Sequence, residues 1–128
     1  MTPQNTTFML AADLAALAQA ASPDACSLCA PLACEGWESL PATFDQSVLI
    51  AAASLRNLQV DEPDLTEYHP NGTHTWSSDA PIAPTYFPYN LCTVWTCRQC
   101  ARVFLRNTEY GGYYVDERIR AVNPALIC

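Results

Sequence analysis

The chain has 128 residues, half of them hydrophobic and only 15% charged, so it can bury a core and is not a disordered segment. This length predicts a single domain, residues 1–128. The net charge is −7, from 13 acidic residues and six arginines, with no lysine. Such acidity makes nucleic-acid binding unfavourable, because affinity for phosphates depends on basic residues. It favours a basic protein partner instead.

The N-terminal stretch is apolar, but no basic residue precedes it and Asp13 interrupts it, so we do not expect a signal peptide. No stretch is long and apolar enough to predict a membrane span. The expected location is therefore the cytoplasm. In that reducing environment, closely spaced cysteines are more often metal ligands or redox groups than structural disulfides.

Two helices are predicted in the N-terminal half. The first covers residues 7–21, where leucines recur at helical spacing among alanines and Pro23 follows. The second covers residues 43–58, where Thr43 and Gln46 have the spacing of a capping box. Its apolar residues form one stripe, made of Phe44, Val48, Ala51, Leu55 and Leu58.

A β-hairpin is predicted over residues 101–121, because Gly111 and Gly112 form a two-residue turn signal between strand-like segments. Placing Tyr110 opposite Tyr113 sets the register. The pairs that follow are Thr108 with Val115, Arg106 with Glu117, and Phe104 with Ile119. Before the hairpin, residues 60–90 carry five prolines, which exclude regular helix over most of this segment. Its aromatic residues predict an ordered irregular segment.

Four of the seven cysteines form two C-x-x-C units, Cys26–Cys29 and Cys97–Cys100. Two residues between cysteines let both thiolates point into one tetrahedral site, so two units predict a four-thiolate Zn²⁺ site. This arrangement resembles zinc-ribbon and zinc-knuckle proteins, in which a C-x-x-C turn connects to a β-hairpin. The resemblance covers residues 26–29 and 97–120 and implies a structural zinc. Alanine follows each unit, at Ala30 and Ala101, where ribbon knuckles usually have glycine.

Two other interpretations of the cysteines stay open. Cys92, Cys97, Cys100 and Cys128 match the spacing of plant-type ferredoxins, although Trp95 and the absence of glycine disfavour a loop around an iron–sulfur cluster. A redox C-x-x-C pair is the other interpretation, although neither unit lies in the expected strand–helix setting. The remaining thiols, Cys34, Cys92 and Cys128, are interpreted as buried side chains or spare ligands. His69 or His74 could replace one cysteine ligand.

The expected fold class is α+β, with two helices in the N-terminal half, a Pro-rich irregular middle and a C-terminal β-hairpin held by the four-cysteine zinc site. No catalytic motif is recognised, so an enzyme is not expected. The leading hypothesis is an acidic zinc-binding protein that binds a basic partner, such as a bacterial immunity protein or inhibitor of a toxin enzyme. The predicted partner-binding residues are Asp61, Glu62, Asp64, Glu67, Tyr68 and Trp76. The alternatives are a zinc-ribbon accessory module of a nucleic-acid machine and a redox or electron-transfer protein.

Overall fold

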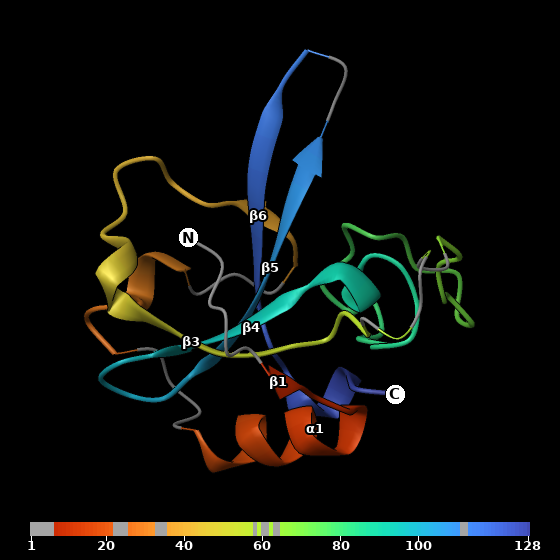
Figure 1. The fold of residues 1–128 in the computed structure, drawn as a ribbon, viewed down its shortest axis with the longest axis horizontal. Coiled ribbons are helices and arrows are strands. Elements are labelled where there is room, and N and C mark those ends of the chain that lie inside the picture. The colour runs from red at the N-terminus through yellow and green to blue at the C-terminus, as the bar shows by residue number, and fades with distance from the viewer. Residues whose placement is uncertain are drawn as a thin grey trace.

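A six-stranded sheet lies at the centre of the computed structural model, which describes residues 7–21, 26–32, 36–57, 59, 62, 65–110 and 113–128 (Figure 1). The strand order is β1-β3-β4-β5-β6-β2. β1 runs parallel to β3, and all other neighbours are antiparallel. The strands are β1 (Thr7–Phe8), β2 (Glu38–Ser39), β3 (Leu49–Ser54), β4 (Thr93–Cys97), β5 (Val103–Tyr110) and β6 (Val115–Ala121).

The described part of the chain has one α-helix, so the prediction of an α+β fold with two N-terminal helices is wrong and the protein is mostly β. Where the second helix was predicted, residues 46–48 form a 3₁₀ turn, η2 (Gln46–Val48), and β3 follows. The turn is capped by Asp45, whose carboxylate accepts a hydrogen bond from the Ser47 amide at 3.0 Å. Alanine has the highest helix propensity, but propensity is a weak determinant, and the pairing of β3 with β4 overrides it.

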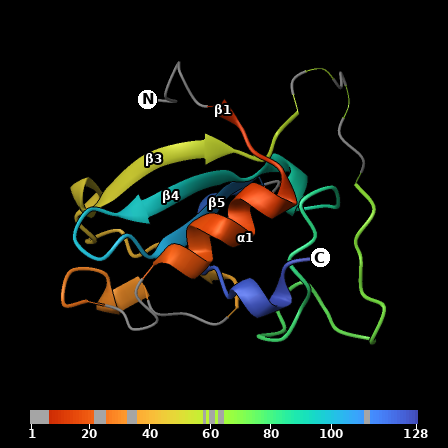
Figure 2. The same cartoon turned by 90° about the horizontal axis from the view of Figure 1, so that it is seen from below.

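The first predicted helix is present but shorter, as α1 (Ala11–Ala20). It starts later because residues 7 and 8 pair with β3 as a strand. The Asp13 carboxylate accepts a hydrogen bond from the Leu10 amide at 3.3 Å, which satisfies one free donor at the start of the helix. Leu14 and Ala18 are buried against the sheet, and Figure 2 shows α1 lying across one of its faces. No helix of the described residues is long and apolar enough to cross a membrane.

The two faces of the sheet each bury a core. The helix-side core lies under α1 and includes Leu14, Trp37, Ala53, Leu55, Ile82, Tyr89, Val94, Val103, Leu105 and Val122. The cysteine-side core lies on the opposite face and includes Cys29, Leu32, Val48, Leu49, Cys97, Phe104, Ile119 and Ala121. Residues that pair across neighbouring strands point to the same face of the sheet. Val94 and Leu105 pair in the helix-side core, and Phe104 and Ala121 pair in the cysteine-side core. A sheet that is buried on both faces explains why its central strands lack a polar side.

The predicted hairpin is present, but its register is shifted by two residues. Tyr110 pairs with Val115 rather than with Tyr113, so four residues separate the strands instead of two. Of these, Gly111 and Gly112 lie outside the described residues. A shift of two keeps each side chain on its predicted face. Arg106 and Glu117 therefore still meet, as a diagonal ion pair at 3.3 Å.

The Pro-rich segment is irregular in its described part, as predicted, and it is buried only in its later part, at Ala80, Ile82, Ala83 and Tyr89, whereas Leu65 and Trp76 are exposed. Ile82 donates its amide to Leu126 at 2.8 Å and accepts from Cys128 at 3.0 Å, which fixes the C-terminal residues against it. Tyr68 and Tyr86 stack with ring centroids 5.0 Å apart. The remaining short helices are 3₁₀ turns: η1 (Ala30–Leu32), η3 (Tyr89–Leu91) and η4 (Pro124–Leu126).

Candidate metal centre

The fold brings the four cysteines of the two C-x-x-C units together. The Cys26 sulfur lies 3.7 Å from that of Cys29 and 3.5 Å from that of Cys97, although Cys97 is 71 residues away in the chain. The sulfurs of Cys29 and Cys100 are 3.6 Å apart. All four sulfurs lie within 4.8 Å of one another. Two turns that are distant in sequence therefore converge on one point.

The second unit forms the turn between β4 and β5. Cys97 is the last residue of β4, and its amide donates to the carbonyl of Arg102 at 2.9 Å, so the two strands stay paired up to the turn. Inside the turn, the Cys97 sulfur accepts hydrogen bonds from the amides of Gln99 and Cys100. Both amides thus point at the sulfur, which favours the thiolate. The prediction that this unit leads into the β5–β6 hairpin is correct, and the unit also forms the turn between the paired strands β4 and β5.

The first unit has the same local arrangement. The Cys26 sulfur accepts hydrogen bonds from the amides of Leu28 and Cys29, two and three residues later, as the Cys97 sulfur does in its own turn. The Cys26 carbonyl accepts from the Ala30 amide at 2.9 Å, and η1 follows. Each unit therefore presents one sulfur that is held by two backbone amides. This shared geometry suits a possible metal-binding site.

The cysteine-side core holds the two units in place. Cys29 and Cys97 are buried, and Cys26 and Cys100 are partly exposed at the edge of the same core. Leu32, which follows the first unit in η1, is buried with Val48 and Phe104. The amide of Arg98, inside the second unit, donates to the Val48 carbonyl at 2.9 Å. Apolar packing and a backbone contact therefore fix the distance between the units.

The geometry fits a tetrahedral metal ion with four thiolate ligands. Zinc–sulfur bonds of about 2.3 Å at tetrahedral angles place neighbouring sulfurs about 3.8 Å apart. The closest sulfur pairs lie at 3.5–3.7 Å, whereas a disulfide would need about 2.05 Å. The cysteines are free thiols and no described histidine or carboxylate joins the group. The residues present therefore fit Zn²⁺, and any ion held by all four has no open position.

The thiols differ in acidity before a metal is bound. Desolvation raises the pKa of Cys26, but hydrogen bonds from the Cys29 amide and the Cys97 thiol outweigh it and lower the pKa to about 6. Burial raises the pKa of Cys29 to about 12, and the neighbouring Cys100 thiol adds to the rise. Burial likewise raises the pKa of Cys97. Four thiolates at this spacing would repel one another strongly, so only a cation allows all four to ionise.

Ala101 turns the chain out of the second unit with a φ of 63°, in the left-handed region that favours glycine. We expect Ala101→Gly to raise the free energy of unfolding by about 0.5–1 kcal/mol, because the strain removed exceeds the entropy that glycine adds to the unfolded chain. Ala30, at the matching position of the first unit, has no positive φ. Ala30→Gly should therefore lower stability by a similar amount. Urea unfolding of both variants measures the difference, and equal effects would contradict this account.

The remaining thiols and the histidines lie apart from the cluster. Cys92 is fully buried and its thiol donates to the Pro88 carbonyl at 3.2 Å, as expected for a buried side chain, whereas Cys128 is exposed. The ferredoxin-type set is therefore not brought together. His69 contacts Glu67 and Thr73, and neither His69 nor His74 joins the described metal group. Cys34 lies outside the described residues.

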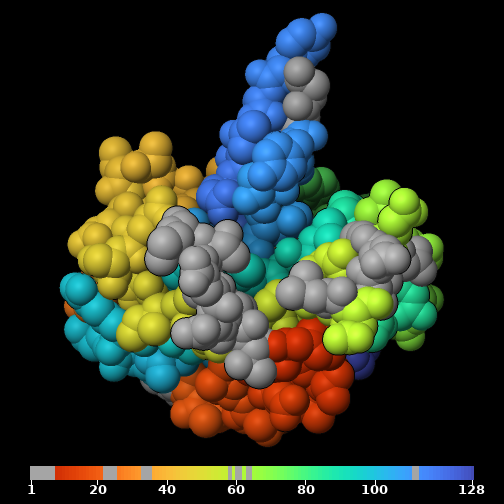
Figure 3. All heavy atoms as spheres, in the orientation of Figure 1, coloured from red at the N-terminus to blue at the C-terminus, as the bar shows by residue number. Residues whose placement is uncertain are grey.

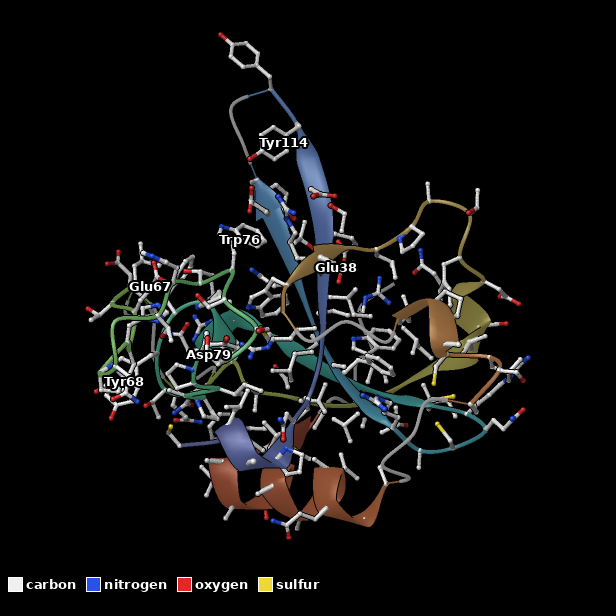
Figure 4. All side chains as sticks on the ribbon, turned by 180° about the vertical axis from the view of Figure 1, so that it is seen from behind. Glu38, Glu67, Tyr68, Trp76, Asp79 and Tyr114 are labelled. Carbon is white, nitrogen blue, oxygen red and sulfur yellow. The ribbon has the colours of Figure 1, made fainter. Side chains whose placement is uncertain are left out.

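The predicted partner-binding residues fall on an exposed loop. Tyr68 and Trp76 are both partly exposed, and Trp76 lies over the guanidinium of Arg118 at 4.5 Å. Glu62 and Glu67 are exposed, whereas Asp61 and Asp64 lie outside the described residues. Glu38, Asp79 and Tyr114 are exposed as well. Figure 4 shows the acidic aromatic surface, which we define as Glu38, Glu67, Tyr68, Trp76, Asp79 and Tyr114.

Glu67 also has a structural role, because its carboxylate accepts hydrogen bonds from Thr75 and His69. These bonds, Thr75 first, lower the pKa of Glu67 from its ordinary value of 4.5. A lowered pKa means that the carboxylate stabilises the loop fully above pH 4.5 and that this contribution is lost as the pH falls through the lowered value. Thr75→Val should raise the Glu67 pKa, measured by NMR titration of the carboxyl carbon. An unchanged pKa would show that the Thr75 bond is absent in solution.

No protein-family model, curated protein or solved structure matches the chain. A metal site is therefore inferred from the geometry of the four-cysteine cluster.

Proposed function

We propose that this chain is a zinc-stabilised binding protein without catalytic activity. The observation that carries the proposal is the convergence of four cysteine sulfurs, within 4.8 Å of one another, from two turns of matching geometry. A catalytic zinc keeps one position for water or substrate, whereas four thiolates complete the tetrahedron. Bound there, Zn²⁺ would supply cross-linking and charge compensation. The cysteines would bind the ion, the buried core would hold the two units in place, and the backbone amides would stabilise the thiolates.

A basic protein is the partner that fits the chain best. The net charge is −7, and the acidic aromatic surface combines exposed carboxylates with exposed rings. Carboxylates speed encounter with a basic surface, and aromatic side chains provide apolar contact area. A bacterial toxin enzyme with a basic nucleic-acid site is a partner of this kind, and an acidic immunity protein or inhibitor would cover it. This class rests on charge and side-chain chemistry alone.

The nucleic-acid module is less well supported, because the arginines that would serve it are engaged within the described structure. Arg120 is fully buried, and Arg106 is largely buried and paired with Glu117. Arg118 pairs with Asp116 at 3.0 Å and with Glu109 at 3.5 Å. Phosphate binding would need these cations to be free and grouped on one surface.

The proposal is tested with the zinc-loaded protein and a partner purified from the native organism. We expect a basic protein whose affinity falls at least about tenfold between low and high salt, because the contact is electrostatically steered. A double change, Glu38→Gln with Asp79→Asn, should weaken binding, while Asp13→Asn serves as a control, at an exposed acid on α1 where the new amide oxygen can still accept from the Leu10 amide. Inhibition of an enzymatic activity of that partner would support the inhibitor role. Salt-sensitive binding to DNA or RNA in place of a basic protein would contradict the proposal.

A further inference from the structure

The β5–β6 hairpin extends beyond the rest of the sheet. Pairing with β4 ends at Arg106, and pairing with β2 ends at Arg118. The outer residues 107–110 and 113–117, which we call the hairpin arm, have no other strand partner among the described residues. At the base of the arm, the Leu40 amide donates to the Glu117 carbonyl at 2.8 Å and the Ser39 hydroxyl donates to Asp116 at 2.8 Å. In the ribbon and in the space-filling view, this part of the hairpin stands out from the body of the molecule (Figures 1 and 3). It is therefore accessible from several sides.

The end of the arm exposes a group of large apolar side chains. Tyr113 is fully exposed, Tyr110 is 78% exposed, Val115 is 66% exposed and Tyr114 is 54% exposed. Single exposed apolar residues are ordinary, but contiguous ones on a protruding element are typical of interaction sites. Tyrosine suits such a site, since it buries a large ring with few rotatable bonds and keeps a polar group for a hydrogen bond.

Side-chain contacts hold the arm in one orientation. On one face, the Thr108 hydroxyl donates to Glu117 at 2.6 Å. On the other, the Tyr114 hydroxyl donates to Glu109 at 2.5 Å, and Arg118 bridges Glu109 to the ring of Trp76. These contacts connect the arm to its base and to the neighbouring loop. An arm that is ordered before binding loses little conformational entropy when it is captured.

The charges of the arm select among partners. Its described residues include three acids, Glu109, Asp116 and Glu117, and no base, and the two arginines at its foot that pair with them, Arg106 and Arg118, leave an excess of one negative charge. A second copy of the chain would also carry a charge of −7 and would be repelled. An anionic lipid surface would be repelled for the same reason. A protein pocket with an apolar floor and a rim of lysine or arginine satisfies both the rings and the acids.

We infer that the hairpin arm is the main docking element of this protein, and that its tyrosines insert into an apolar pocket with a basic rim on a protein partner. The inference rests on the proposed binding function and goes further by naming the contact. Trp76 lies at the foot of the arm and belongs to the acidic aromatic surface, so the contact made by the arm continues onto that surface. We expect Tyr110 and Tyr113 to be the main anchors, because they are the most exposed rings of the arm and a few large aromatic side chains contribute most of the energy of such contacts.

The experiment uses the full zinc-loaded chain with the photo-crosslinking residue p-benzoyl-L-phenylalanine at Tyr113, produced in the native organism. Matched chains carry the same group at Tyr68, on the acidic aromatic surface, and at Ile50, an exposed position on β3. We expect an adduct at Tyr113 and none at Ile50, with the cross-linked partner peptide rich in lysine or arginine. With that partner purified, Tyr110→Ala with Tyr113→Ala should weaken binding at least about tenfold. Tyr113→Phe should keep most of the affinity, since the ring is retained.

Each other outcome overturns the inference. An adduct with another copy of the chain would show self-association, and an adduct with lipid would show membrane binding. Absence of a Tyr113 adduct, or unchanged affinity of the double alanine variant, would show that the arm does not dock. An adduct at Tyr68 alone would contradict docking through the hairpin arm but would still agree with the proposed binding function. Absence of adducts at both positions would overturn both. Circular dichroism and elemental analysis of each variant confirm that the fold and the zinc are retained.

Discussion

Cys97→Ser is expected to release zinc from the protein and to unfold it at moderate temperature. Serine is a poor zinc ligand, and Cys97 also joins β4 to the cysteine-side core. Structural zinc contributes about 10–16 kcal/mol in isolated zinc fingers, which matches or exceeds the roughly 5–15 kcal/mol net stability of an ordinary domain. We therefore expect one zinc per wild-type chain, almost none in the variant after dialysis, and a fall in Tm of at least about 15 °C.

The control for this result is Cys128→Ser. Cys128 is exposed and lies outside the cluster, so its replacement should change neither the zinc content nor the Tm appreciably. Elemental analysis and thermal unfolding by circular dichroism measure both quantities. Equal losses in the two variants, or an iron–sulfur absorption band in the wild type, would contradict a zinc site. Zinc affinity should also fall with decreasing pH, because protons compete for thiolates, and a chelator competition at two pH values detects the change.

Arg120→Ala should lower the free energy of unfolding by about 3–5 kcal/mol without changing the zinc content. The guanidinium is fully buried and donates to the carbonyls of Ala80 at 2.9 Å and Ser78 at 3.3 Å, and to the Tyr89 hydroxyl. Truncation leaves these acceptors without donors and opens a cavity. Arg120→Met should cost less, because its side chain still fills part of the space.

Arg118→Ala is the matched control for Arg120. Arg118 lies two residues earlier on β6, on the same face, but it is partly exposed and its ion pairs are screened by solvent. Its loss should cost about 1 kcal/mol or less. Urea unfolding followed by tryptophan fluorescence gives both values. If the two alanine variants were equally stable, the buried hydrogen bonds of Arg120 would not be a major support of the Pro-rich segment.

The four-cysteine cluster could be predicted because the geometry of each C-x-x-C half is local, although the contact between the halves is not. Two residues between cysteines dictate the turn, and the turn directs both sulfurs to one side. The hairpin was predictable for the same reason, from glycines between strand-like segments. The register of the hairpin could not be predicted, because the two-residue turn and the four-residue connection differ only in whether Tyr113 and Tyr114 belong to the strand or to the connection. Both keep every side chain on its face, so the pattern of residues cannot separate them.

The error over residues 43–58 has a different physical origin. Alanines and leucines there fit a helical stripe, but Leu49 and Ala53 are buried in cores on opposite faces of the sheet. A register shift between Ala51 and Ala53 moves the buried side chains from one face of β3 to the other, and this breaks the alternation that identifies a strand. Pairing with β4, a strand far along the sequence, decides the outcome. The burial of Arg120 was equally hidden, since its acceptors belong to a loop that lies 40 residues earlier.

The separation of the two C-x-x-C units also has a consequence for synthesis. Cys26 and Cys97 are 71 residues apart, so at about 5–20 residues per second the ribosome needs roughly 4–14 s to add the second pair after the first. During that time the nascent chain carries a two-thiol site that cannot close. The strands β5 and β6, which complete the sheet, arrive even later because they follow Cys100 in the sequence. A four-cysteine metal site could therefore close only after residue 100 has been added, and a product that ended before it would keep the thiols of the first unit without their partners.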